Sequence, residues 1–125
     1  MLLLRSVYLT ICGIFCVCLW PYATLAANVT AGKSLYQQYC SACHGAQGKG
    51  NGPAAAAMQP KPRDHTDGTY MNRLSDMHLR KVIGEGGAVV GRSPLMPSWN
   101  ATLTPEQIGD VIAYLRTLAI PAYQP

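Results

Sequence analysis

The segment Cys40-Ser41-Ala42-Cys43-His44 decides how this chain folds and what it can bind. It is a C-x-x-C-H sequence, the pattern at which a haem is covalently attached. Two thiols three positions apart on a helical turn lie on similar sides, so both can reach the vinyl groups at one haem edge. His44 follows directly and can turn its imidazole under the iron. The segment therefore predicts one haem c, held by two thioether bonds, with His44 as an iron ligand.

Two other kinds of site also use a C-x-x-C pair. A thioredoxin-like redox pair sits at the start of a helix within a βαβ pattern, whereas this pair follows a predicted helix and no segment alternates like a strand. A zinc site needs two more ligands. His65 and His78 could supply them, but their spacing is irregular and no second cysteine pair follows. Haem attachment is the prediction that fits the segment best.

The N-terminal segment of this 125-residue chain does not resemble a domain. Arg5 is the only charge in the first 32 residues, and an apolar run leads to Pro21 and the small residues 23–27. This order is typical of a secretory signal peptide. We expect residues 1–26 to be a signal peptide and residues 27–125 to be one domain in the periplasm. The alternative is a leader retained as a membrane anchor facing the periplasm, although a spanning helix needs about 20 apolar residues.

Composition limits what residues 27–125 can do. They carry nine Lys and Arg against six Asp and Glu, a formal charge of +3 without a run of like charges. Nucleic-acid binding is therefore not predicted. Cys40 and Cys43 are their only cysteines, which excludes a disulfide framework. A domain of this size buries a modest core and often depends on a cofactor for stability.

Hydrophobic periodicity predicts an all-α domain in which Gly- and Pro-rich loops separate four helical segments. These cover residues 29–39, 54–58, 75–83, and a stretch that begins at Pro105 and ends before Pro121. Thr104 and Gln107 are placed as a capping box at the start of the last helix. Ser75 is a suitable N-cap for the third segment, and Gly84 is a suitable residue to end it. The expected buried positions are Leu79, Val82, Ile83, Ile108, Val111, Ile112, Leu115 and Leu118.

Several side chains could provide a second iron ligand: Met58, Met71, Met77, Met96, His65 and His78. Met96 lies in Ser93-Pro94-Leu95-Met96-Pro97, where the prolines stiffen the backbone. Such a segment can hold a thioether sulfur against iron, and we predict Met96 as the ligand. The alternative is that Met96 fills the core, the usual role of methionine. Met77 and His78 are expected to be surface or packing residues, and His65 is expected to be solvated.

These segments, taken in order, resemble the class I cytochrome c family, particularly its small bacterial periplasmic members. The resemblance covers C-S-A-C-H-G, G-K-G-N-G-P-A-A, P-K-P-R-D, P-L-M-P-S-W and I-A-Y-L. It implies an all-α fold of three to five helices around one covalently attached haem. It also implies that the first and last helices cross closely, through Gly32, Tyr36, Val111 and Tyr114.

The resemblance also implies roles for three further residues around the haem. The carbonyl of Pro53 is expected to accept a hydrogen bond from Nδ1 of His44. Arg63 and Trp99 are expected to approach the haem propionates. The alternatives are a solvated loop charge for Arg63 and ordinary core packing for Trp99.

The resemblance implies a single-electron carrier rather than an enzyme. Iron held by both His44 and Met96 is six-coordinate and leaves no position for a substrate. We expect transient contacts with redox proteins, and membrane contact only if the leader is retained. Two alternatives are kept: a haem subunit of a larger oxidoreductase, and a ligand-binding haem sensor or enzyme in which Met96 is displaced.

Overall fold

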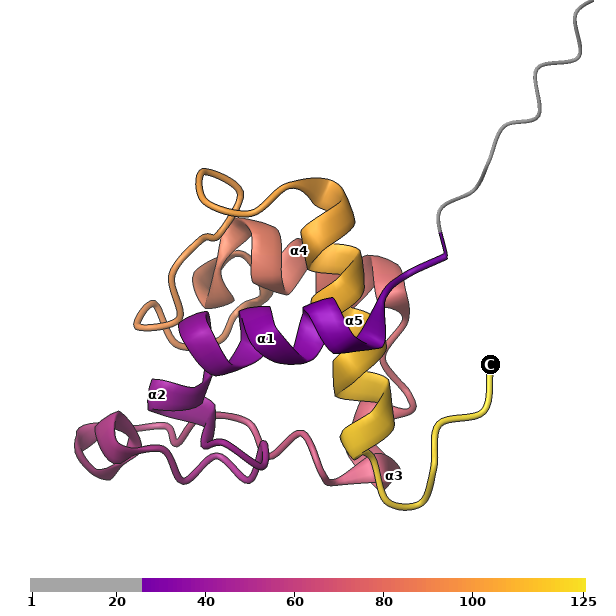
Figure 1. The fold of residues 1–125 in the computed structure, drawn as a ribbon. Helices are drawn as coiled ribbons and strands as arrows, with labels where there is room; N and C mark the ends of the chain where they lie inside the picture. Colours follow the sequence, from indigo (N-terminus) through magenta and orange to yellow (C-terminus); the bar gives the residue numbers. More distant parts are fainter. Residues whose placement is uncertain (1–25) are drawn as a thin grey trace, which may run out of the picture.

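The computed structural model describes residues 26–125, and these form helices around one core (Figure 1). In chain order the elements are α1 (Val29–Tyr39), α2 (Ser41–His44), the 3-10 helix η1 (Pro53–Ala57), α3 (Gly68–Met71), α4 (Asp76–Glu85), the 3-10 helix η2 (Gly87–Val90) and α5 (Pro105–Leu118). No strand forms in the described part; a single parallel bridge joins Asp67 and Ile120. The predicted all-α class is confirmed. The predicted leader, except for its last residue, lies outside the described residues.

None of the helices from residue 26 onward has the length and apolar character needed to cross a bilayer.

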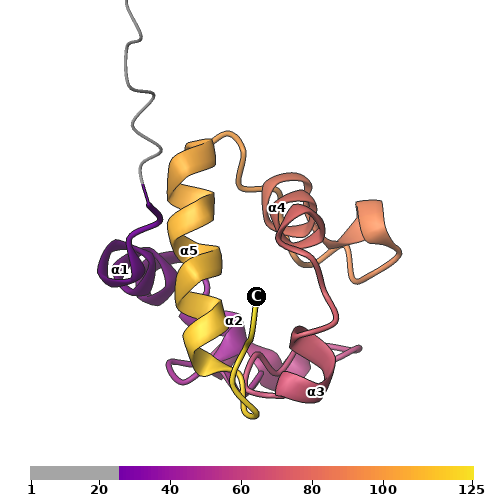
Figure 2. The same ribbon diagram turned by 90° about the vertical axis from the view of Figure 1, so that its right-hand side faces the viewer.

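Helix α1 crosses α5 at Gly32, and the two backbones touch there (Figure 1). A Cβ placed on Gly32 would overlap the carbonyl oxygen of Asp110 on α5. One turn further along α1, Tyr36 is fully buried, and its ring centroid lies 5.3 Å from that of Tyr114. Figure 2 shows α5 between α1 and α4. The expected close crossing of the first and last helices is therefore present.

Replacing Gly32 with alanine should destabilise the fold although alanine is the better helix former. The added Cβ meets backbone of α5, which cannot rotate away, so the helices must separate. Overpacking of this kind typically costs about 1–3 kcal/mol, more than the ~1 kcal/mol gained from helix propensity. Denaturant unfolding followed by circular dichroism should show the loss. Lys33→Ala, at the exposed neighbouring position, is the control, and equal stability of the two variants would contradict the prediction.

Two helix starts follow their sequence signals. The Ser75 hydroxyl accepts a hydrogen bond from the backbone N–H of His78 at 3.1 Å. At the start of α5, the N–H of Thr104 donates to Oε1 of Gln107 at 2.9 Å, and the N–H of Gln107 donates to Oγ1 of Thr104 at 3.2 Å. This reciprocal pair confirms the predicted capping box.

The predicted end of the third segment was wrong. Helix α4 continues through Gly84 to Glu85 and ends at Gly86, whose φ of 91° lies in a region that favours glycine. Gly84 has a different role, because a Cβ there would overlap the side chain of Asn100. Its lack of a side chain lets the segment after residue 96 pack closely against α4.

Helix α3 was not predicted from the hydrophobic pattern. Hydrogen bonds to the C-terminal residues hold it in place. The N–H of Gly68 donates to the carbonyl of Ile120 at 3.0 Å, and the N–H of Ile120 donates to the carbonyl of Thr66 at 2.9 Å. From α5, Arg116 donates to the carbonyls of Met71 and Leu74 at 2.8 and 2.6 Å. These bonds fix the wall of the cavity described next.

Candidate cofactor site

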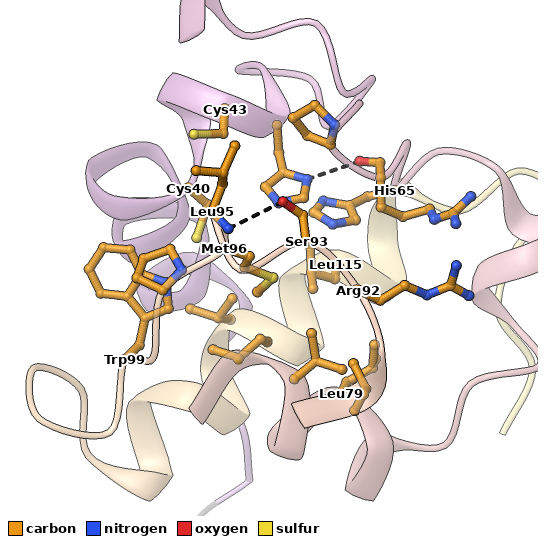
Figure 3. A pocket seen from close by; sticks show the side chains of 18 of the residues that line it. Cys40, Cys43, His65, Leu79, Arg92, Ser93, Leu95, Met96, Trp99 and Leu115 are labelled. Carbon is orange, nitrogen blue, oxygen red and sulfur yellow. Dashed lines mark hydrogen bonds between the residues drawn. The ribbon is translucent and has the colours of Figure 1, made fainter. Parts of the chain in front are cut away.

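A cavity of about 460 Å³ opens between the helices, a size typical of a small-molecule or cofactor site (Figure 3). Apolar side chains of α4 and α5 form one wall: Leu79, Val82, Ile83, Val111 and Leu115. The side chains that carry the predicted chemistry also line it: Cys40, Cys43, His44 and Met96. The fold therefore brings together four residues that the sequence spreads over more than 50 positions.

The two cysteines reach the cavity because the chain turns directly after α1. Cys40 is the C-cap of α1, and its carbonyl accepts hydrogen bonds from the N–H groups of Cys43 and His44 at 3.2 and 2.9 Å. Both thiols are free and half-buried. Burial raises the pKa of the Cys40 thiol to about 12, and the neighbouring Cys43 acts in the same direction. Before haem is attached, Cys40 is therefore a neutral thiol at physiological pH.

His44 is held in the form that a metal ligand requires. Its Nδ1 lies 2.9 Å from the carbonyl oxygen of Arg63. Because a carbonyl only accepts, Nδ1 carries the proton and the lone pair is on Nε2. Burial lowers the pKa of His44, while the bond to Arg63 opposes that shift. The predicted acceptor, the Pro53 carbonyl, is corrected to that of Arg63: Pro53 begins η1, and the 60–65 loop approaches His44 instead.

His65 is buried, which corrects the expectation that it is solvated. Only 8% of it is exposed, and its ring is stacked on that of His44 with centroids 4.2 Å apart and planes 19° apart. Its Nδ1 lies 3.4 Å from the hydroxyl oxygen of Tyr36. Burial lowers the pKa of His65 well below its usual value, and His44 and Arg63 act in the same direction. Because the residues next to His65 in the sequence are polar, nothing in the sequence indicated that His65 is buried.

Met96 enters the cavity from a loop that hydrogen bonds hold closed (Figure 3). The carbonyl of Met96 accepts from the N–H of Gly87 at 3.0 Å, and its N–H donates to the carbonyl of Ser93 at 3.2 Å. After Met96 the chain is hydrogen-bonded to the end of α4. The N–H groups of Trp99 and Asn100 donate to the carbonyl of Gly84 at 3.2 and 3.1 Å. The backbone is thus fixed on both sides of Met96.

Arg63 and Trp99 lie at different ends of the cavity. The Trp99 ring packs on that of Tyr39, with 5.3 Å between centroids. At the other end, the guanidinium of Arg63 lies 3.9 Å from the centre of the Tyr70 ring. Arg92, which the sequence analysis missed, donates to the Tyr70 hydroxyl at 3.0 Å. Figure 3 shows Arg92 across the cavity from Trp99 and the cysteines.

His78 also lines the cavity, from α4, and is half-buried. Met77, in contrast, is 79% exposed.

The family model for Cytochrome c matches residues 29–119. The chain belongs to the cytochrome c family. Membership implies a covalently attached haem c with its iron, and a role in haem electron transfer. The cavity fits a haem. Its wall carries two free thiols, His44 offers the lone pair on Nε2, and the remaining wall is apolar.

Individual relatives include a small cytochrome and a much larger enzyme. The chain is 29% identical to cytochrome c-555 of Prosthecochloris aestuarii over 94 residues, which covers 70% of this chain and 85% of that protein. It is 30% identical over 96 residues to the quinohemoprotein alcohol dehydrogenase ADH IIB of Pseudomonas putida, covering 76% of this chain. This chain spans only 12% of the length of that dehydrogenase.

Two solved structures share the fold. A chain of the Kuenenia stuttgartiensis reducing HAO-like protein complex Kustc0457/Kustc0458 matches with a TM-score of 0.62 and 26% identity, covering 80% of this chain and 47% of that one. The c-type cytochrome KustC0563 matches with a TM-score of 0.53 and 27% identity, covering 70% of this chain and 96% of that one. The cytochrome fold is therefore found both as nearly a whole chain and as part of a longer one.

Proposed function

We propose that this cytochrome is a single-electron carrier in which haem c is attached through Cys40 and Cys43 and ligated by His44 and Met96. The observation that carries the proposal is that these four side chains line one cavity. His44 presents a lone pair on Nε2 because Nδ1 is committed to the Arg63 carbonyl. Met96 is the methionine whose backbone is held on both sides.

The residues of the site favour electron transfer over reaction with a substrate. His44 and Met96 would together hold the iron of a bound haem and leave no position for a reactant, so the group would supply electron exchange with a partner. A thioether ligand favours the ferrous state, and so do walls of Leu, Val and Ile, because they disfavour added positive charge. The protein thus holds and tunes the group that carries the electron.

Arg63 and Arg92 are suited to the haem propionates. The vinyl groups and the propionates lie on opposite edges of a haem, so attachment at the cysteines directs the propionates across the cavity. The two arginines meet around Tyr70 at that end. Guanidinium groups pair strongly with carboxylates. Trp99 packs on Tyr39 and lines the cavity, and its contact with a propionate stays a prediction.

The ferric absorption spectrum tests the proposal. Ligation by Met96 should give the weak far-red band of thioether-bound ferric haem, and carbon monoxide should bind the reduced protein poorly. Both results are expected because neither axial position is free. Absence of the band together with ready binding of carbon monoxide would contradict the carrier and favour a ligand-binding haem protein.

A second candidate is a haem subunit or domain of a larger oxidoreductase. It is favoured by the similarity to a short part of the Pseudomonas putida dehydrogenase and to about half of a chain in the Kuenenia stuttgartiensis complex. Electron transfer would be unchanged, but the partner would be permanent rather than transient. Size-exclusion chromatography of the native protein separates the two, since a free carrier elutes alone.

We propose a periplasmic location, reached through a signal peptide at residues 1–26. The support is the order of a charged start, an apolar run and small residues. Retention of this segment as an anchor would keep the same domain on the periplasmic face of the membrane.

A further inference from the structure

We propose that His65 is a positioning residue that fixes the orientation of the His44 imidazole about its bond to the iron. The inference rests on the proposed ligation by His44 and assigns a role that the electron-carrier function alone does not require. It is carried by the stacking of the two rings, with 4.2 Å between centroids and 19° between planes.

A single hydrogen bond does not fix the plane of an axial imidazole. The bond from Nδ1 of His44 to the Arg63 carbonyl, at 2.9 Å, restrains one edge of the ring. The face of the ring can still tilt about the line between that bond and Nε2. A flat ring packed against this face opposes the tilt, because any rotation brings the two rings into overlap. His65 supplies that flat surface.

His65 can act as a support only if it is itself held. Its backbone N–H donates to the carbonyl of Gly48 at 2.6 Å. Its Nδ1 makes a long contact of 3.4 Å with the hydroxyl of Tyr36, and that hydroxyl donates to the carbonyl of Gly45 at 3.1 Å. Because the hydroxyl has one proton, given to Gly45, Nδ1 of His65 is the donor to Tyr36. The His65 tautomer and ring orientation are therefore both defined.

The contacts that hold His65 lead back to His44 itself. Gly45 is the next residue after His44, so the path runs from the ligand's own backbone through Tyr36 and His65 to the face of its ring. Tyr36 is fully buried against Tyr114 where α1 crosses α5. The crossing of the two helices thereby anchors the ring plane of His44. Figure 3 shows His65 inside the cavity, among the residues that line it.

The plane of an axial imidazole determines which iron d orbital it overlaps. In low-spin ferric haem this sets the g values in electron paramagnetic resonance and the spread of the haem methyl shifts in nuclear magnetic resonance. These signals respond to ligand orientation and not to global stability. They distinguish a positioning role from ordinary core packing.

The test uses the haem-loaded full chain carrying His65→Ala, His65→Phe or Tyr36→Phe. His65→Ala removes the flat surface, so the g values should shift and their features broaden as the ring plane becomes variable. His65→Phe keeps a flat ring and should restore narrow features. Tyr36→Phe keeps the core packing but removes the hydroxyl, so a smaller broadening is expected. Met77→Ala, at an exposed position of α4 outside the cavity lining, is the control and should leave the g values unchanged.

Unchanged g values and methyl shifts in His65→Ala would overturn the inference, even if that variant unfolds more easily. Equal spectral changes in His65→Ala and Met77→Ala would also overturn it, since the effect would then not depend on the ring packed against His44. Failure of the proposed function would look different. The ferric wild-type protein would itself be high-spin, or its spectrum would be unaffected by loss of His44, whatever the His65 variants do.

Discussion

Replacing Met96 with alanine should lower the midpoint potential and open the iron to added ligands. The thioether favours ferrous iron, so its loss stabilises the ferric state and exposes one axial position. Axial ligands span a range of roughly 0.8 V in haem proteins, and a drop of about 100 mV or more is expected here. Redox titration followed by absorbance gives the potential, and carbon monoxide binding to the reduced protein reports the open position.

Met58→Ala is the matched control because Met58 also lines the cavity. It should leave the potential and the far-red ferric band close to those of the wild type. If Met58→Ala lowers the potential and Met96→Ala does not, the assignment of the ligand is wrong. Met77→Ala, at an exposed position of α4, should change neither quantity.

The double variant Cys40→Ala with Cys43→Ala should yield little folded, haem-loaded protein. Without thioether bonds the haem can leave, and the apolar cavity then has nothing to fill it. At about 24 cal/mol per Å³, an empty cavity of about 460 Å³ sets an upper limit on the order of 10 kcal/mol. That is comparable with the whole stability of a typical domain, about 5–15 kcal/mol. Circular dichroism and the haem content of the purified protein measure the loss.

Ala42→Ser, at the exposed position between the two cysteines, is the control for expression and should retain haem. Each single cysteine variant keeps one thioether and should give an intermediate yield. A double variant that folds normally without haem would show that the helices do not depend on the cofactor for their stability.

The signals that predicted structure correctly are local ones. The capping box at Thr104 and Gln107 acts within four residues, and the C-x-x-C-H segment that predicted haem c holds its two cysteines and its histidine within five. A signal of this kind can be recognised without knowing the rest of the fold. The proline-flanked segment at Met96 is local in the same way, because the prolines restrict the backbone wherever the segment lies; its role as an iron ligand stays a prediction.

The features that the sequence concealed depend on partners far along the chain. Gly84 was expected to end a helix, but it makes room for Asn100, 16 residues further on. His65 has polar neighbours and was expected in solvent, yet Tyr36 and His44 bury it. The hydrogen-bond acceptor of His44 was expected to be the Pro53 carbonyl but is the Arg63 carbonyl, because the 60–65 loop folds back over His44. None of these contacts has a periodicity or motif that a single sequence displays.

The anchoring of the Met96 loop has a consequence for how the domain can open. The N–H groups of Trp99 and Asn100 bind the carbonyl of Gly84, and the Ser98 hydroxyl donates to that carbonyl as well. Before the loop can swing out, it must break these bonds and leave a carbonyl at the C-terminal end of α4 without a partner. An excursion that exposes the Met96 side of the cavity is therefore a local opening that costs several hydrogen bonds, although α4 itself can stay folded. We expect such openings to be rare.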